Sequence, residues 1–127
     1  MANPEHLAIL KQGENAWNLW RANNTEITPD LTCADLRALI LSHYHCQNDE
    51  SHWTTVNLSH ADLRECHLGH SYLRFARLNH ATLAGANLIG VNLAYAQLQG
   101  TDFGSSPKSV VEVEEFSSSD LRLKWVP

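Results

Sequence analysis

The chain has 127 residues, 43% of them hydrophobic, and a formal net charge of −5 at pH 7. This length and composition fit one folded domain with a modest core and exclude a natively disordered chain. The acidic balance argues against non-specific binding to nucleic acid, because neutralising phosphates takes lysines and arginines.

The sequence contains no apolar run of about 18 residues, so we expect no membrane span. The first ten residues, MANPEHLAIL, lack the basic and apolar regions of a secretion signal, and we expect a cytoplasmic protein. The three cysteines, Cys33, Cys46 and Cys66, are odd in number and unpatterned in spacing, which predicts reduced thiols rather than a disulfide framework.

The N-terminal region, residues 1 to 28, is predicted to form a capping helix and a turn. Asn3 and Pro4 are a favourable N-cap and first-turn pair. An apolar stripe at helical spacing then predicts one helix over about residues 4 to 22; its members are Leu7, Leu10, Trp17 and Trp20. We expect this stripe to close the end of the core that follows, and ANNTEITPD to turn the chain into it.

From residue 29 to 104, large side chains recur every five positions, with smaller ones two residues before each. A helix would scatter such a column around its axis, and a strand would alternate it between two faces. A chain that turns a corner every five residues sends one large and one small side chain inward and leaves three positions outside. The predicted inner column is Leu31, Leu36, Leu41, Cys46, Leu58, Leu63, Leu68, Leu73, Leu78, Leu83, Leu88, Leu93, Leu98 and Phe103.

Units such as ADLRE, ATLAG, ANLIG and VNLAY resemble the A(D/N)LXX motif of the pentapeptide-repeat family. The resemblance covers residues 30 to 104 with one gap and is to a small, cyanobacterial-type member. It implies an all-β solenoid: a right-handed quadrilateral β-helix with four pentapeptides, or twenty residues, to a coil. Counting units predicts fifteen of them, about four coils, capped by the N-terminal α-helix.

The gap contains the stretch HYHCQNDESH, residues 43 to 52. Leu41 and Leu58 are seventeen residues apart, which is three units plus two residues. We favour a bulge of two residues among 47 to 50, in an irregular loop near 47–52, which puts Cys46 and Trp53 in the inner column. A larger irregular loop from 44 to 56 is the alternative, since Trp53 is bulky for that column.

The same stretch raises the question of a zinc site, because it holds three histidines and a cysteine. In the five-residue register, Tyr44 and Cys46 point inward while His43 and His45 point outward. Four ligands of a tetrahedral zinc site must converge on one point. We therefore predict no metal site and no cofactor.

The C-terminal region, residues 105 to 127, is predicted to be a cap or tail. VVEVEEF is β-branched and partly alternating, which suggests a strand. SSSDLRLKWVP reads as a degenerate return of the repeat. This end either caps the last coil or pairs with a second copy, so a monomer and a homodimer both stay open.

The outward positions gather no nucleophile with a base and an orienting group, so we expect no enzyme. His60 and His80, twenty residues apart, should lie in one solvated column, with metal binding or pH response as the weaker hypothesis. Phe75 and Tyr95 form a second such column. With the flanking Tyr72 and Arg74 they are a candidate interaction surface, although an aromatic ladder that only stabilises the fold is an equal alternative.

These features predict a non-catalytic protein–protein interaction module or scaffold with an unidentified protein partner. The alternative comes from the resemblance: some family members modulate DNA gyrase or topoisomerase by imitating acidic B-DNA. The outward positions from 53 to 104 weaken it, because three acids are balanced by three arginines: Asp62, Glu65 and Asp102 against Arg64, Arg74 and Arg77. A small-molecule or metal binder rests only on the eight histidines.

Overall fold

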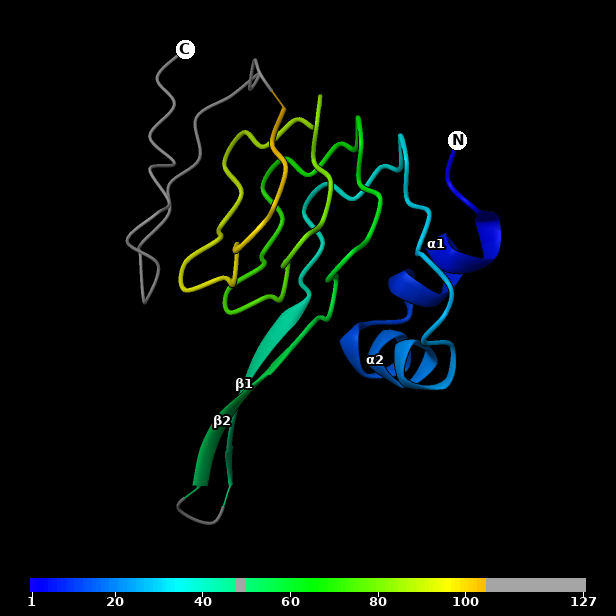
Figure 1. Ribbon diagram of the computed structural model, residues 1–127. Helices are drawn as coiled ribbons and strands as arrows, with labels where there is room; N and C mark the ends of the chain where they lie inside the picture. Colours follow the sequence, from blue (N-terminus) through cyan, green and yellow to red (C-terminus); the bar gives the residue numbers. More distant parts are fainter. Residues whose placement is uncertain (48–49, 105–127) are drawn as a thin grey trace.

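The computed structural model describes residues 1–47 and 50–104. Two helices, α1 (Pro4–Lys11) and α2 (Glu14–Asn23), precede two strands, β1 (Ser42–Gln47) and β2 (Glu50–Thr55). The rest of the described chain winds in five-residue units (Figure 1). The strand, cap and dimer contact predicted for residues 105–127 lie outside the described residues.

In the winding after the hairpin, residues twenty apart lie side by side. Parallel bridges join Asn57 to Arg77 and, further along, Tyr72 to Asn92. Backbone hydrogen bonds accompany them: the Arg77 amide donates to the oxygen of residue 56 at 3.0 Å, and its own oxygen accepts from residue 58 at 2.7 Å. Four five-residue units therefore complete one circuit, and Figure 1 shows the successive circuits side by side.

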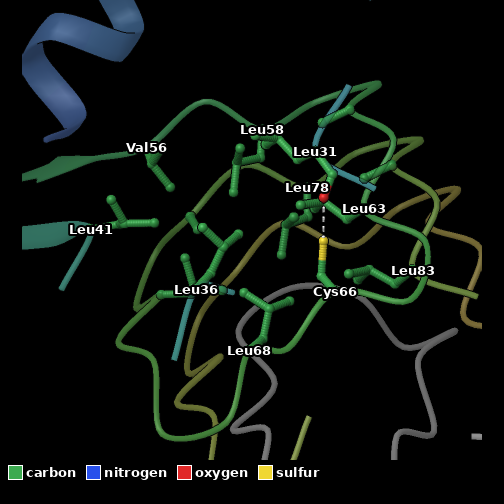
Figure 2. Close-up of a cluster of buried hydrophobic side chains, with 14 of the residues drawn as sticks. Leu31, Leu36, Leu41, Val56, Leu58, Leu63, Cys66, Leu68, Leu78 and Leu83 are labelled. Atoms are coloured by element: carbon green, nitrogen blue, oxygen red, sulfur yellow. Dashed lines mark hydrogen bonds between the residues drawn. The ribbon is translucent and has the colours of Figure 1, made fainter. Parts of the chain in front are cut away.

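The central residue of each unit points into the middle of the winding (Figure 2). Phe103 is only partly buried against this core. Burying one leucine side chain stabilises the fold by about 1.5–3 kcal/mol, so this column is its main apolar contribution. Twelve central leucines are at most 3% exposed: Leu31, Leu36, Leu41, Leu58, Leu63, Leu68, Leu73, Leu78, Leu83, Leu88, Leu93 and Leu98.

The motif has Asp or Asn before the central leucine because the side chain at that position accepts a backbone hydrogen bond. The Asp62 Oδ1 atom accepts a hydrogen bond from the backbone N–H of Arg64 at 3.2 Å, and Asn92 Oδ1 does the same for Ala94 at 3.0 Å. These short polar side chains thus satisfy an amide at the corner. The same contact recurs at Asp30, Asp35, Asn57, Asn87 and Asp102.

From Leu58 to Leu98, each corner places the second residue after the central leucine at a positive φ, which is about 60° at His60, Phe75, His80 and Tyr95. The turn closes with a hydrogen bond such as that from the Ala61 amide to the Leu58 oxygen at 3.1 Å. A side chain in this left-handed conformation costs about 1–2 kcal/mol. Contacts between neighbouring circuits must offset that cost.

The interruption of the repeat is a β-hairpin, so the favoured two-residue bulge was wrong. Bridges across it join Asp30 to Asp62 and Asp35 to His67, which are 32 residues apart instead of twenty, so the insertion is twelve residues long (32 − 20). β1 and β2 pair antiparallel from residues 42 and 55 to residues 47 and 50. The hairpin projects away from the winding (Figure 1). The alternative loop from 44 to 56 had nearly the right extent, but the segment is regular.

The hairpin also removes Cys46 and Trp53 from the inner column. Cys46 pairs with Ser51 across the hairpin, and Trp53 pairs with Tyr44, whose side chain is 56% exposed instead of pointing inward. The physical reason is that a cross-strand aromatic pair stabilises a hairpin. Three units precede the insertion and ten follow it, which makes thirteen, or slightly more than three circuits, instead of fifteen units and about four coils.

The expected single N-terminal helix is two helices, because the chain turns at Gly13. This glycine has φ 107°, a conformation that other residues rarely adopt. Asn3 caps α1 as predicted, since its Oδ1 atom accepts from the amide of residue 5 at 2.9 Å. Leu10 and Trp17 are fully buried. Neither helix among the described residues is long and apolar enough to cross a membrane.

Side chains of α2 occupy the open edge of the first circuit, at the positions where a preceding circuit would pair. The Asn57 oxygen accepts from Trp17 Nε1 at 2.7 Å and from Arg21 Nη1 at 3.0 Å, and the Asn57 amide donates to Asn18 Oδ1 at 2.8 Å. Arg21 also donates to the Ser59 oxygen at 2.8 Å. This helix therefore prevents the edge from pairing with another chain.

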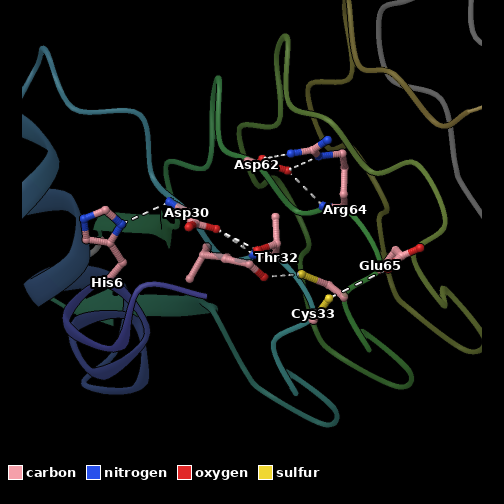
Figure 3. A network of polar contacts seen from close by, with 9 residues as sticks. His6, Asp30, Thr32, Cys33, Asp62, Arg64 and Glu65 are labelled. Atoms are coloured by element: carbon pink, nitrogen blue, oxygen red, sulfur yellow. Dashed lines mark hydrogen bonds and ion pairs between the residues drawn. The ribbon is translucent and has the colours of Figure 1, made fainter. Parts of the chain in front are cut away.

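α1 caps a second side of the same circuit through Asp30. The amide of Asp30 donates to His6 Nδ1 at 3.0 Å (Figure 3), and its oxygen accepts from the Asn3 amide at 3.0 Å. His6 is only 7% exposed, so this bond is shielded from water. The imidazole acts as an acceptor here and must carry its proton on the other nitrogen.

Candidate functional site

Aromatic rings from the hairpin and from one side of the winding form a continuous group, which we call the aromatic surface. It consists of Tyr44, Trp53, Tyr72, Phe75 and Tyr95, with Arg74 among them. Trp53 is its hub: the Trp53 ring centroid lies 5.4 Å from Tyr44, 6.2 Å from Tyr72 and 5.2 Å from Phe75. The Phe75 and Tyr95 rings stack at 5.1 Å with an interplanar angle of 18°.

Arg74 lies over three of these rings. Its guanidinium carbon is 5.6 Å from the Trp53 centroid, 5.5 Å from Phe75 and 4.8 Å from Tyr95. Each distance is within the range of a cation–π contact. The structure thus brings together all four residues predicted as a candidate surface: Tyr72, Arg74, Phe75 and Tyr95.

The five-residue unit determines how these side chains are presented. Tyr72 precedes a buried central leucine, and Arg74 follows it, so both point outward. Phe75 and Tyr95 occupy the corner position with φ 62° and 60°, one circuit apart. All four are half-buried, because each is flanked by its neighbours.

Sequence reasoning missed the contribution of the hairpin, Trp53 and Tyr44. A signal was present: two six-residue runs, each with one aromatic residue and the second ending in two threonines, flank a short polar pair, as in a hairpin. Reading that segment in the five-residue register instead hid the cross-strand pair. Trp53 was consequently placed in the core.

A contact with α2 fixes the base of the hairpin. His43 of β1 lies with its Nδ1 atom 2.5 Å from Oε1 of Glu14, which is only 4% exposed. Glu14 stands in the first turn of α2, where the helix dipole favours a negative charge. The hairpin is therefore held to α2 through His43 and to the winding through Trp53, whose ring lies against Tyr72 and Phe75.

His60 and His80 form a second ring ladder on a different corner, as predicted. Their ring centroids are 5.1 Å apart with an interplanar angle of 20°, and both side chains are exposed. Within residues 1–47 and 50–104, no three His, Cys, Asp or Glu side chains are grouped to hold a metal ion. The His60–His80 ladder has the same corner position and the same ring stacking as the Phe75–Tyr95 ladder, so it is a matched control for it.

The side of the winding in Figure 3 carries paired charges. Arg64 donates to both carboxylate oxygens of Asp62, at 2.9 and 2.7 Å, and these bonds lower the pKa of Asp62. On the next side of the winding, where Asp35 stacks on His67, Arg37 binds Asp35 in the same way and lowers its pKa. Because Asp62 and Asp35 are each neutralised by an arginine two residues on, these two positions add no unpaired negative charge of the kind that imitation of DNA requires.

Cys66 belongs to the core and is not a reactive thiol. Its Sγ atom donates to the oxygen of Leu31 at 2.7 Å (Figure 2), and burial raises the pKa of the thiol to about 12. The thiolate, which is the nucleophilic form, is therefore almost absent near neutral pH. Cys33, by contrast, is exposed at a corner.

Comparison with known families agrees with this geometry. The model of pentapeptide repeats matches residues 54–83 and 71–105, with eight copies. Residues 54–105 belong to the pentapeptide-repeat family. The three units before the hairpin lie outside that match, yet they bridge to the matched pentapeptide repeats and bury the same central leucines. No curated protein and no solved structure matches the chain.

Proposed function

We propose that this pentapeptide-repeat chain is a non-catalytic protein–protein interaction module whose docking site is the aromatic surface. Members of the family are generally structural or interaction modules. The observation that carries the proposal is the clustering of Tyr44, Trp53, Tyr72, Phe75 and Tyr95 around one arginine. Tyrosine, tryptophan and arginine are the residues enriched at the energetic centres of interfaces.

Stabilisation of the fold alone accounts for only part of this cluster. Stacking between circuits explains Phe75 and Tyr95, since it offsets the cost of their positive φ. The cross-strand contact with Trp53 accounts for the presence of Tyr44 in the hairpin but not for its exposure, since Tyr44 stays 56% exposed on a strand that projects from the winding. An exposed aromatic side chain that continues a larger aromatic group, as Tyr44 does beside Trp53, is typical of a contact site.

The winding supplies the rigid support for this surface. We propose that it is the right-handed quadrilateral β-solenoid that the resemblance implies, with the hairpin inserted at one corner of the first coil. In this arrangement each outward residue of a unit lies within two positions of its buried central leucine, which fixes the backbone that carries it. Preorganised side chains lose little conformational entropy when a partner binds, which favours affinity.

Quantitative affinity capture from the native host tests the proposal. The test variant is Phe75→Asn with Tyr95→Asn, because asparagine tolerates the left-handed conformation. The matched control is His60→Asn with His80→Asn, which removes the other ladder from the same corner position. We expect specific partners, identified by mass spectrometry, to be lost with the first variant and retained with the second. Equal capture by both variants would remove the aromatic surface as the docking site.

A further inference from the structure

We propose that Arg74 recognises a carboxylate of an acidic peptide segment in the partner, with the surrounding rings taking the apolar residues beside that acid. This inference rests on the proposed interaction function and names the chemistry of the partner. It starts from the local contacts of Arg74, which differ from those of the other arginines at equivalent positions.

Three arginines occupy the position after a central leucine: Arg37, Arg64 and Arg74. In the first two units, the residue before the leucine is an aspartate, and the arginine donates two hydrogen bonds back to it, the shorter at 2.7 Å in both cases. In the third unit, Tyr72 takes the place of the aspartate. Arg74 therefore has no carboxylate two residues before it, unlike Arg37 and Arg64.

The aromatic rings hold Arg74 without using its hydrogen-bond donors. The guanidinium carbon lies 4.8 Å from the Tyr95 centroid and 5.5 Å from that of Phe75. Within the described part of the chain, the guanidinium makes no hydrogen bond or ion pair. A planar guanidinium carries five N–H donors, and a carboxylate accepts two of them in parallel. A carboxylate thus matches the unsatisfied donors of this group.

The charge around Arg74 points to the same ligand. The units stacked on this side are LILSH (39–43), SYLRF (71–75) and VNLAY (91–95), and Arg74 is their only Asp, Glu, Lys or Arg. An acidic segment meets no repulsion there, and Phe75 and Tyr95 offer apolar contact beside it. Single-stranded nucleic acid also stacks on such rings, but one arginine on a chain of charge −5 is a poor match for a row of phosphates.

The experiment is selection of binders to the full chain from a displayed library of random 16-residue peptides. The enriched peptides are then synthesised with their acids intact or changed to the matching amides. We expect enrichment of an Asp or Glu next to an apolar residue, and at least about tenfold weaker binding for the amide version.

Variants of the protein assign this dependence to Arg74. Arg74→Gln is expected to weaken binding at least about tenfold, whereas Arg77→Gln, which removes the exposed arginine of the next unit, leaves it unchanged. Tyr72→Asp gives Arg74 an aspartate two residues before it, as Arg64 has in Asp62. This carboxylate should compete with the peptide for Arg74, so Tyr72→Asp should weaken binding more than Tyr72→Asn. Thermal melts of all variants confirm that each is folded.

The possible outcomes separate the two proposals. Peptides bound equally well as acids and amides, or unaffected by Arg74→Gln, overturn the role of Arg74 while leaving an interaction surface. A single-stranded oligonucleotide of 20 nucleotides that binds more tightly than the selected peptides also overturns it. Failure to enrich any peptide contradicts both the acidic ligand and this surface as a peptide-docking site.

Discussion

The indole nitrogen of Trp17 donates a 2.7 Å hydrogen bond to the backbone oxygen of Asn57, forty positions along the chain. Trp17 is fully buried, so one side chain both covers the apolar end of the core and satisfies the edge of the first circuit. Repeat proteins need such a cap because the terminal unit otherwise exposes backbone and core. The cap is therefore expected to control the stability of the whole winding.

Replacing Trp17 by phenylalanine should lower the free energy of unfolding by about 1–2 kcal/mol, since it removes the hydrogen bond and part of the buried ring. Urea unfolding followed by circular dichroism measures the change. Trp20→Phe is the control, because Trp20 is only partly buried; its effect should be clearly smaller. Equal effects would show that the bond to Asn57 contributes nothing.

The Asp62–Arg64 pair predicts a specific response to acid. The pKa of Asp62 is lowered in the fold, so the contribution of the pair is present above about pH 4 and is lost as the pH falls through the folded-state value. Asp62→Asn keeps the acceptor for the Arg64 amide, and we expect it to cost less than about 1 kcal/mol at pH 7 and to weaken the loss of stability at pH 3.

The control for that experiment is Asp62→Ala, which removes the corner acceptor as well as the charge. We expect it to be less stable than Asp62→Asn at both pH values, by about 1 kcal/mol. Urea titrations at pH 7 and pH 3 supply the comparison. If the asparagine variant lost as much stability in acid as the original protein, the pair would not be the source of the pH dependence.

Gly100 stands twenty residues after His80, at the end of the His60–His80 ladder. A Cβ atom placed there would clash with Nδ1 of His80, and the glycine has φ 73°. Gly100→Ala should therefore destabilise the protein by about 1 kcal/mol through its backbone, and further by displacing the histidine ring from His60. In the double variant with His80→Ala there is no ring to displace, so only the backbone part of the destabilisation should remain. Strictly additive effects in thermal unfolding would contradict the contact.

The two described thiols should react very differently. With a pKa of about 12, Cys66 has about one thiolate in ten thousand at pH 8, and its sulfur is buried as well. We expect iodoacetamide to alkylate the exposed Cys33 in the folded protein, and Cys66 only after denaturation. Peptide mapping by mass spectrometry distinguishes them. Rapid labelling of Cys66 without denaturant would mean that the core around it opens.

Excision of the hairpin tests whether it is an insertion into an otherwise continuous repeat. Removing residues 44 to 55 joins the unit ending at His43 to the unit beginning at Val56, so the register is restored. We expect one cooperative transition within about 2 kcal/mol of the original stability. Removing only residues 44 to 53 leaves two extra residues and should be less stable. The reverse order would contradict the twelve-residue insertion.

The leucine column and the helical cap were predictable because each depends on local pattern. A spacing of five fits neither a helix nor a strand, so only a chain that turns at every fifth residue buries Leu58 and Leu63 alike. The cap at Asn3 is likewise local. The break between the helices was harder to predict, because it depends on one glycine with a positive φ.

The hairpin could not be separated from a bulge by spacing alone. Seventeen residues between Leu41 and Leu58 accommodate three units and two extra residues, or one unit and an insertion of twelve. The choice depends on energies that act between distant residues: Trp53 on Phe75, and His43 on Glu14. For the same reason Trp53 was absent from the predicted surface.

Photo-cross-linking tests the central claim, that the aromatic surface contacts a protein partner, most directly. A photoreactive phenylalanine analogue replaces Phe75 in one variant and His60 in another, two positions with the same corner geometry on different sides of the winding. After irradiation in the native host, we predict a discrete protein adduct from position 75 and none from position 60. Adducts from position 60 alone, or from neither position, would contradict the account.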